Sequence, residues 1–177
     1  NKGMRELASK INPDVTVLVG GAEDVTSLVL TPVDSVVMLD VLEHIEKDDE
    51  QVRKIFTTLK DGGEFIVVVP AHPFLYGMRD IGMSHYRRYT KKTLRKVLSD
   101  NGFCIVTMRH WNMLGFFPYM VAEKILKKPL EAKFRGGTKT GVGTVMLRKG
   151  LHLWFRFIEN TFDFKFGLSI IAVARKL

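Results

Sequence analysis

Asp40, Glu43 and His44 carry the side chains of this chain that are best suited to chemistry. Their i, i+3, i+4 spacing means that one helical turn would bring all three to one side. An imidazole with a pKa of about 6.5 can take a proton at neutral pH, and a carboxylate beside it can orient it. The triplet predicts either an acid–base site or a structural arrangement, in which Asp40 caps a helix and the other two side chains hydrogen-bond a loop.

The triplet directly follows the apolar run 36–39, which is typical of a strand buried on both faces. Strands of that kind belong to parallel or mixed sheets that are covered by helices. In open α/β sheets, ligands bind beyond the carboxyl ends of the strands. A functional interpretation therefore begins at this strand end, with the structural one left open.

Apolar periodicity predicts helices and strands that alternate along the first half of the chain. Helices are expected over 1–11, between Asp48 and Gly62, and between Thr90 and Gly102; strands are expected at 15–19, 34–39, 64–69, 103–111 and 168–174. Asp48 is expected to cap its helix, with Gln51 as the capping-box partner. Such alternation predicts a parallel α/β sheet. The polar, aromatic loop 71–89 is too long for a mere connection, as functional loops often are.

Length, cysteine count and charge limit the kinds of protein that this sequence can encode. The 177 residues fit one domain with a sizeable core. A single cysteine, Cys104, excludes a disulfide framework and fits a reducing, cytoplasmic environment. No apolar run reaches the length of a membrane-spanning helix. The formal net charge of +8 favours anionic partners or surfaces without identifying one.

A series of segments resembles, in order, those of the class I S-adenosylmethionine-dependent methyltransferases. They are VLVGGAED (17–24), DSVVMLDVLEH (34–44), LKDGGEFIVVVP (59–70), HYRRYTKKTLRKVLSDNGF (85–103) and FGLSIIAVARK (166–176). The resemblance is to the small-molecule type, similar to the ubiquinone-pathway O-methyltransferases. It implies one domain over 1–177 with a Rossmann-like sheet, mostly parallel with an antiparallel last strand, and a helical insert at 112–165. The family's first two strands and glycine-rich loop have no counterpart, so we expect an N-terminal piece to be missing.

The resemblance implies S-adenosylmethionine as the cofactor and S-adenosylhomocysteine as its product. Gly21 and Ala22 match the pair that meets the adenine ring in the family. Gly21 has no side chain, so Glu23 is expected to supply the carboxylate that the family usually has there. Leu39 and Asp40 match the positions that lie under the cofactor.

Methyl transfer to oxygen needs a group that removes the proton of the acceptor. His44 is the first candidate for that base, because an imidazole titrates near neutral pH and the Glu43 carboxylate could orient it. His85 is the second candidate, since its loop matches a substrate-side segment of the family. A structural hydrogen bond is the alternative for each histidine. Asp40, Glu43 and His44 could instead ligate a divalent cation. A site without metal is favoured, because many relatives without metal share the Leu-Glu-His sequence.

The function implied is methyl transfer to a small-molecule acceptor, with an apolar or lipid-linked acceptor as the finer hypothesis. Aromatic stripes at 113–126 and 145–157 predict a helical cap over a largely apolar pocket, and a homodimer surface or a peripheral membrane contact is the alternative. The basic segment 85–96 is expected to be a solvated helix face preceded by a turn that matches the family, so nucleic acid is not favoured as a partner. A catalytically inactive, methyltransferase-like interaction domain is the alternative function.

Overall fold

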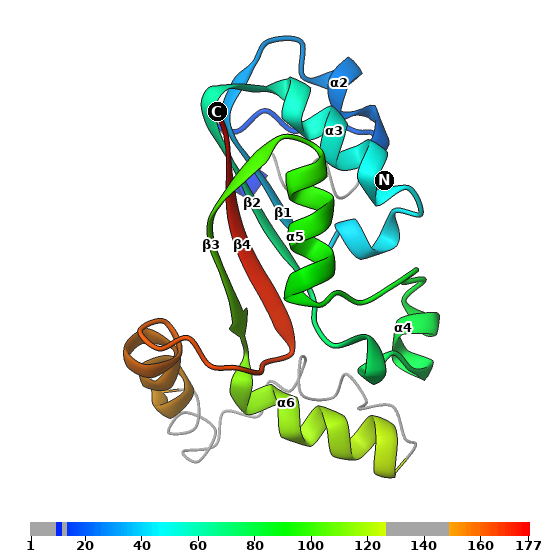
Figure 1. Ribbon diagram of the computed structural model, residues 1–177, viewed down its shortest axis with the longest axis vertical. Coiled ribbons are helices and arrows are strands. Elements are labelled where there is room, and N and C mark those ends of the chain that lie inside the picture. Colours follow the sequence, from blue (N-terminus) through cyan, green and yellow to red (C-terminus); the bar gives the residue numbers. More distant parts are fainter. Residues whose placement is uncertain (1–9, 12–13, 127–148) are drawn as a thin grey trace.

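The computed structural model describes residues 10–11, 14–126 and 149–177. Four strands form one sheet in the order β1-β2-β4-β3 (Figure 1): β1 Val33–Leu39, β2 Leu59–Pro70, β3 Phe103–Trp111 and β4 Ser169–Lys176. β1 and β2 are parallel, and β4 is antiparallel to both of its neighbours. The carboxyl ends of β1, β2 and β3 therefore lie at one edge. The predicted α/β sheet with an antiparallel last strand is confirmed.

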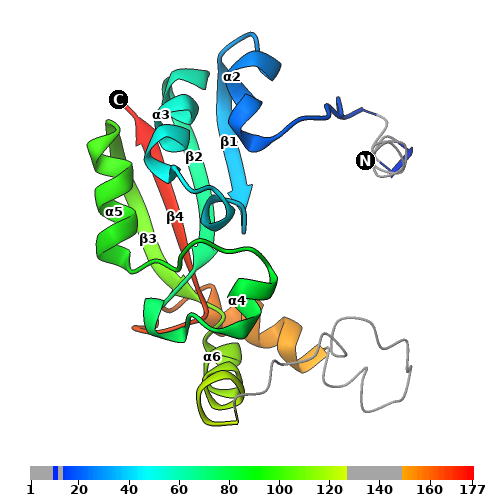
Figure 2. The same ribbon diagram turned by 90° about the vertical axis from the view of Figure 1, so that its right-hand side faces the viewer.

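One face of the sheet forms the core. Alternate residues of β2 and β4 are fully buried, as the two-residue period of a strand requires: Phe65, Val67, Val69, Ile170, Ala172 and Ala174. Helices α3, Asp48–Thr58, and α5, Lys91–Asp100, lie side by side over this face (Figures 1 and 2). They contribute Val52, Ile55, Leu94 and Leu98 to the same cluster. Burying each large aliphatic side chain stabilises the folded state by about 1.5–3 kcal/mol. This helical layer therefore stabilises the sheet whose carboxyl edge is described below.

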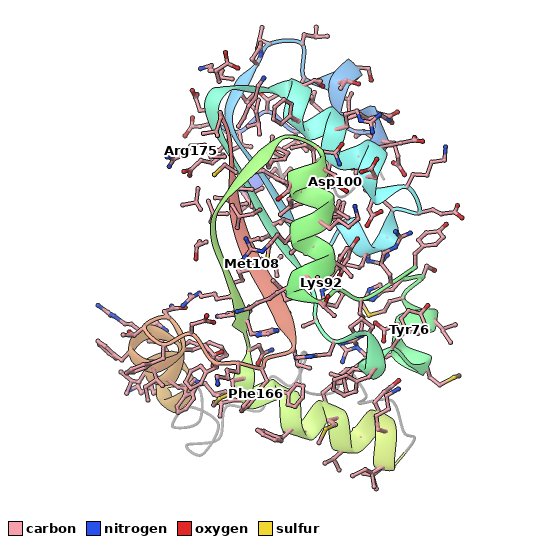
Figure 3. The ribbon with its side chains drawn as sticks, in the orientation of Figure 1. Tyr76, Lys92, Asp100, Met108, Phe166 and Arg175 are labelled. Carbon is pink, nitrogen blue, oxygen red and sulfur yellow. The ribbon has the colours of Figure 1, made fainter. Side chains whose placement is uncertain are left out.

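Further helices gather at the end of the sheet where β3 stops and β4 begins (Figure 1). They are α4, Met78–Gly82, and α6, Met113–Met120, which continues as a π-helix over Val121–Ile125. Residues 149–154 are helical and continue as the π-helix Phe155–Glu159. Phe166, labelled in Figure 3, packs with Leu75, Phe116 and Tyr119 in a second small core. The remaining elements are α2, Val25–Leu28, and single 3-10 turns at Ala22–Asp24, Leu42–His44 and Pro73–Leu75.

Four sequence-based expectations about the elements are wrong. β1 is not buried on both faces, because Val37 and Leu39 are 55% and 58% exposed. The helix that begins at Asp48 ends at Thr58, and residues 59–63 already belong to β2. Residues 15–19 form no strand, and Val15, Leu18 and Val19 are each more than half exposed. No strand lies beside them in the described part of the chain, and a strand needs a neighbour for its backbone hydrogen bonds. Asp48 does not cap α3; Lys47 holds that position, because the Asp48 carboxylate accepts hydrogen bonds from Arg87 and Tyr89.

The expected helix 1–11 lies outside the described residues except for positions 10–11, which are helical. Within the described residues, no helix combines the length and apolar character needed to cross a membrane.

Candidate functional site

A cavity of about 420 Å³ opens at the carboxyl edge of the sheet. Residues from every strand or strand end at this edge line it, together with side chains of the loop 71–89 and of α6: Asp40, Glu43, His44, Pro70, Arg79, Met83, His85, Arg88, Trp111, Asn112, Tyr119, Leu168 and Ser169. Asp40 and Asn112, the first residues after β1 and β3, have left-handed backbones with φ of 51° and 63°. Non-glycine residues rarely adopt this conformation, and when they do they often lie at functional sites.

Glu43 is the least satisfied side chain of this cavity. It lies in the 3-10 turn Leu42–His44 and is 0% exposed. Neither carboxylate oxygen has a hydrogen-bond partner among the described groups. Burial raises the pKa of Glu43 from 4.5 to about 7, and the negative charges of Asp40 and Asp80 act in the same direction. Glu43 is therefore able to hold or release a proton near neutral pH.

His85 lies beside Glu43 and is oriented by a carboxylate. Its Nδ1 donates to Oδ1 of Asp80 at 2.9 Å, which leaves Nε2 as the free nitrogen. That Nε2 lies 4.0 Å from Oε1 of Glu43. The ring of His44 meets the His85 ring edge-on, with the centroids 4.5 Å apart. The structure thus brings together Glu43, His44 and His85, the three residues that the sequence predicted as catalytic.

Asp80 was not predicted, although it organises this side of the site. Its side chain is buried and accepts from Nε of Arg88 at 2.8 Å and from the backbone N–H of Gly77 at 3.0 Å. Burial alone would raise the pKa of Asp80, but the hydrogen bond and the charge of Arg88 outweigh it and hold the pKa below its usual value. Asp80 is therefore a charged anchor for the His85 ring. Its position within the long loop 71–89 was the only signal for it in the sequence.

Comparisons with known proteins bear on the fold that holds this site. A family model described as a methyltransferase domain matches residues 1–67. An S-adenosylmethionine-dependent methyltransferase from Mesorhizobium loti is 13% identical with a TM-score of 0.59, and the match covers 99% of this chain and 77% of that one. One from Archaeoglobus fulgidus is 12% identical with a TM-score of 0.53, covering 97% and 72%. A protein from Haloferax volcanii in complex with a methyltransferase activator is 16% identical with a TM-score of 0.56, covering 97% and 66%.

The chain has the class I methyltransferase fold. The predicted resemblance to S-adenosylmethionine-dependent methyltransferases is confirmed at this level, whereas nothing in these comparisons supports the ubiquinone-pathway subtype. The chain spans only about two thirds of the length of the Haloferax volcanii protein. No curated protein sequence matches the chain significantly.

In this methyltransferase fold, the predicted cofactor residues lie on two segments. Gly21 precedes the turn Ala22–Asp24. Two side chains of α3 donate hydrogen bonds to backbone carbonyl groups of that turn: Gln51 to Ala22 O at 2.7 Å and Lys54 to Glu23 O at 2.9 Å. Leu39 and Asp40 form the exposed end of β1. Glu23 lines a second cavity of about 280 Å³, Asp40 lines the larger one, and His44 lines both. The two cavities are distinct, and His44 belongs to the wall of each.

Two expectations about the site need correction. Asp40 does not share a helical turn with Glu43 and His44, because its left-handed backbone precedes that turn; it reaches the same cavity from the strand end. In the basic segment 85–96, the side chains of Lys92, Arg95 and Lys96 are exposed on α5, whereas two arginines before the helix are paired. Arg88 is buried against Asp80, and Arg87 donates to Asp48 at 2.8 Å.

The expected apolar pocket is also wrong. Four charged residues, Asp40, Glu43, Arg79 and Arg88, are among those that line the larger cavity. The insert contributes Tyr119 of α6 to the wall, but Phe117 of the same helix is 51% exposed. Positions 145–148 of the second predicted cap segment lie outside the described residues.

Proposed function

We propose that the full-length protein transfers the methyl group of S-adenosylmethionine to the oxygen of a small-molecule acceptor bound in the cavity of about 420 Å³. This proposal rests on one observation: the side chains of Glu43, His44 and His85 lie together beside the exposed end of β1. In the methyltransferase fold this is the edge at which ligands bind.

The described residues fit the adenosine side of such a cofactor. Leu39 leaves an apolar side chain 58% exposed where β1 ends, and the Asp40 side chain is exposed beside it. Gly21, Ala22 and Glu23 would hold the adenine ring, and Leu39 and Asp40 the segment next to it. Bound S-adenosylmethionine would supply an electrophilic methyl group and leave as S-adenosylhomocysteine.

The chain's own residues would position the acceptor and take its proton. The acceptor oxygen forms a bond to the transferred carbon as its O–H bond breaks, and His44 accepts that proton with Glu43 beside it. His85, held by Asp80, is the second candidate for this role. Placing the oxygen in line with the methyl group supplies much of the rate, because the reaction needs no covalent intermediate. Arg79 and Arg88 in the same cavity favour an acceptor with polar or anionic groups over a wholly apolar one.

Calorimetry of full-length protein with S-adenosylmethionine and with S-adenosylhomocysteine tests the first part. We expect both to bind, with His44→Ala leaving their affinities unchanged. Release of S-adenosylhomocysteine with a panel of hydroxyl acceptors, graded from catechols to polyprenyl phenols, tests the second part. Failure of either ligand to bind would contradict the proposal and leave the inactive interaction domain as the better hypothesis.

A further inference from the structure

The Glu43–His44–His85 cluster contains buried polar atoms that the described residues leave unsatisfied. Both oxygens of Glu43 and Nε2 of His85 have no hydrogen-bond partner within the described part of the chain. Glu43 is 0% exposed and the side chain of His85 is 8% exposed. Native proteins rarely leave buried polar atoms without a partner, because each one costs stability. These atoms therefore point to a ligand that is able to accept their lone pairs.

The unsatisfied atoms converge on one place. One ligand atom each from Glu43, His44 and His85 lies within 4.8 Å of the other two. Glu43 is buried and the side chain of His85 is 8% exposed, whereas His44 is exposed. Metal–ligand bonds of about 2.1 Å bring neighbouring ligands closer than this, and rotation of the His44 ring would close the cluster around an ion.

The surroundings of His85 match those of a metal ligand. A histidine that binds a metal through one ring nitrogen usually donates the other N–H to a carboxylate, which fixes the tautomer and the ring orientation. Asp80 receives Nδ1–H of His85 at 2.9 Å, and Arg88 and the backbone of Gly77 hold Asp80. The free Nε2 is thereby aimed at Glu43.

We propose that Glu43, His44 and His85 bind one divalent transition-metal ion, with its open coordination positions facing the cavity. Two imidazole nitrogens and one carboxylate suit Zn²⁺, Mn²⁺ or Fe²⁺ better than Ca²⁺, which prefers oxygen ligands. The ligand set differs from the one that the sequence indicated, because His85 takes the place of Asp40. The role of the ion rests on the proposed function and replaces the general base there: with His44 and His85 bound to the ion, the acceptor oxygen would bind it as well and release its proton to water in the cavity. Binding of the ion does not depend on that function.

The test uses full-length, untagged protein that has been freed of metal with a chelator. Mn²⁺ binding is followed by electron paramagnetic resonance and Zn²⁺ binding by calorimetry. We expect one ion per chain. Glu43→Gln and His85→Asn should each weaken binding by at least about 10-fold, and Asp80→Asn by about 10–100-fold through the orientation of His85. Asn at position 85 keeps a donor for Asp80 and removes only the nitrogen that faces Glu43.

His152→Asn is the matched control, because His152 is an exposed histidine outside the cluster. It should bind the ion as the wild type does. Thermal unfolding without metal confirms that each variant is folded, and Glu43→Gln should melt no lower than the wild type. Absence of binding, wild-type affinity in Glu43→Gln, or an equal loss in His152→Asn would overturn the metal site. Binding of S-adenosylmethionine to the same samples distinguishes this failure from failure of the proposed function.

Discussion

Glu43→Gln should make the metal-free protein more stable above neutral pH. Glu43 is 0% exposed, and neither oxygen has a partner among the described residues. Burial raises its pKa from 4.5 to about 7. Glutamine has the same shape and no charge, so the variant removes the ionisation and keeps the packing.

The sign and size follow from the difference in pKa between the folded and unfolded states. The folded protein holds the proton more tightly, so the wild type bears no penalty below pH 4.5 and loses stability as the pH rises from 4.5 to about 7. Above that pH the penalty is constant. A difference of roughly 2.5 in pKa, at 1.36 kcal/mol for each unit, corresponds to about 3 kcal/mol. We therefore expect Glu43→Gln to gain about 2–3 kcal/mol at about pH 8 and nothing near pH 4.5.

Urea unfolding in the presence of a chelator, at pH values from about 5 to about 8, measures this difference. The free energy of unfolding of the wild type should fall across this range relative to that of Glu43→Gln. Added Zn²⁺ should narrow this difference, because the wild type is expected to bind the ion more tightly than Glu43→Gln does. Parallel pH profiles for the two proteins would refute the reasoning, since they would mean that Glu43 is not a buried, unpaired carboxyl group.

Three further changes have distinct expected outcomes. Asp80→Asn should lower the free energy of unfolding by about 3–5 kcal/mol in urea titrations, because it leaves the buried Arg88 without its charged partner; Asp49→Asn, at an exposed pair with Arg53, should cost less than about 1 kcal/mol. Tyr89→Phe should lower it by about 1.5–3 kcal/mol, since the phenol donates to Asp48 at 2.8 Å. His44→Ala should reduce turnover roughly 10²–10⁴-fold in the methyl-transfer assay. Unchanged turnover would remove His44 from the mechanism.

Patterns local in the sequence predicted the fold well. The apolar run before Asp40 became β1, and β3 has the predicted bounds Phe103–Trp111. Thr90 caps α5 as expected, with its hydroxyl accepting from the backbone N–H of Thr93 at 3.0 Å. Residues 15–19 have the composition of a strand but form none, because pairing depends on neighbours that a local pattern does not reveal.

The candidate site could be predicted only in part, for a similar reason. The spacing of Glu43 and His44 is local, so the sequence showed that they lie together. The approach of His85 depends on a contact between distant segments, in which the backbone N–H of Tyr86 donates to Glu43 O at 2.8 Å. Asp80 acts through the same loop and has no distinguishing sequence pattern. Glu43 and Asp80 are equally buried, but only Asp80 has a hydrogen-bond partner. This difference arises when the distant segments of the sheet edge come together, so the sequence alone did not reveal it.

The insert and the site are joined by a chain of buried polar contacts. Arg88 donates to Asp80 on one side and to the hydroxyl of Tyr119 in α6 on the other, and its guanidinium also hydrogen-bonds Ala71 O at the end of β2. The adjoining π-helix is tied to the loop 71–89 as well, since Glu123 accepts from the backbone N–H of Arg79 at 3.2 Å. Breaking one link would leave a buried charge or donor unpaired, which costs more than the contact itself contributes. Because Asp80 fixes the ring of His85, the position of α6 is coupled to that imidazole through two side chains.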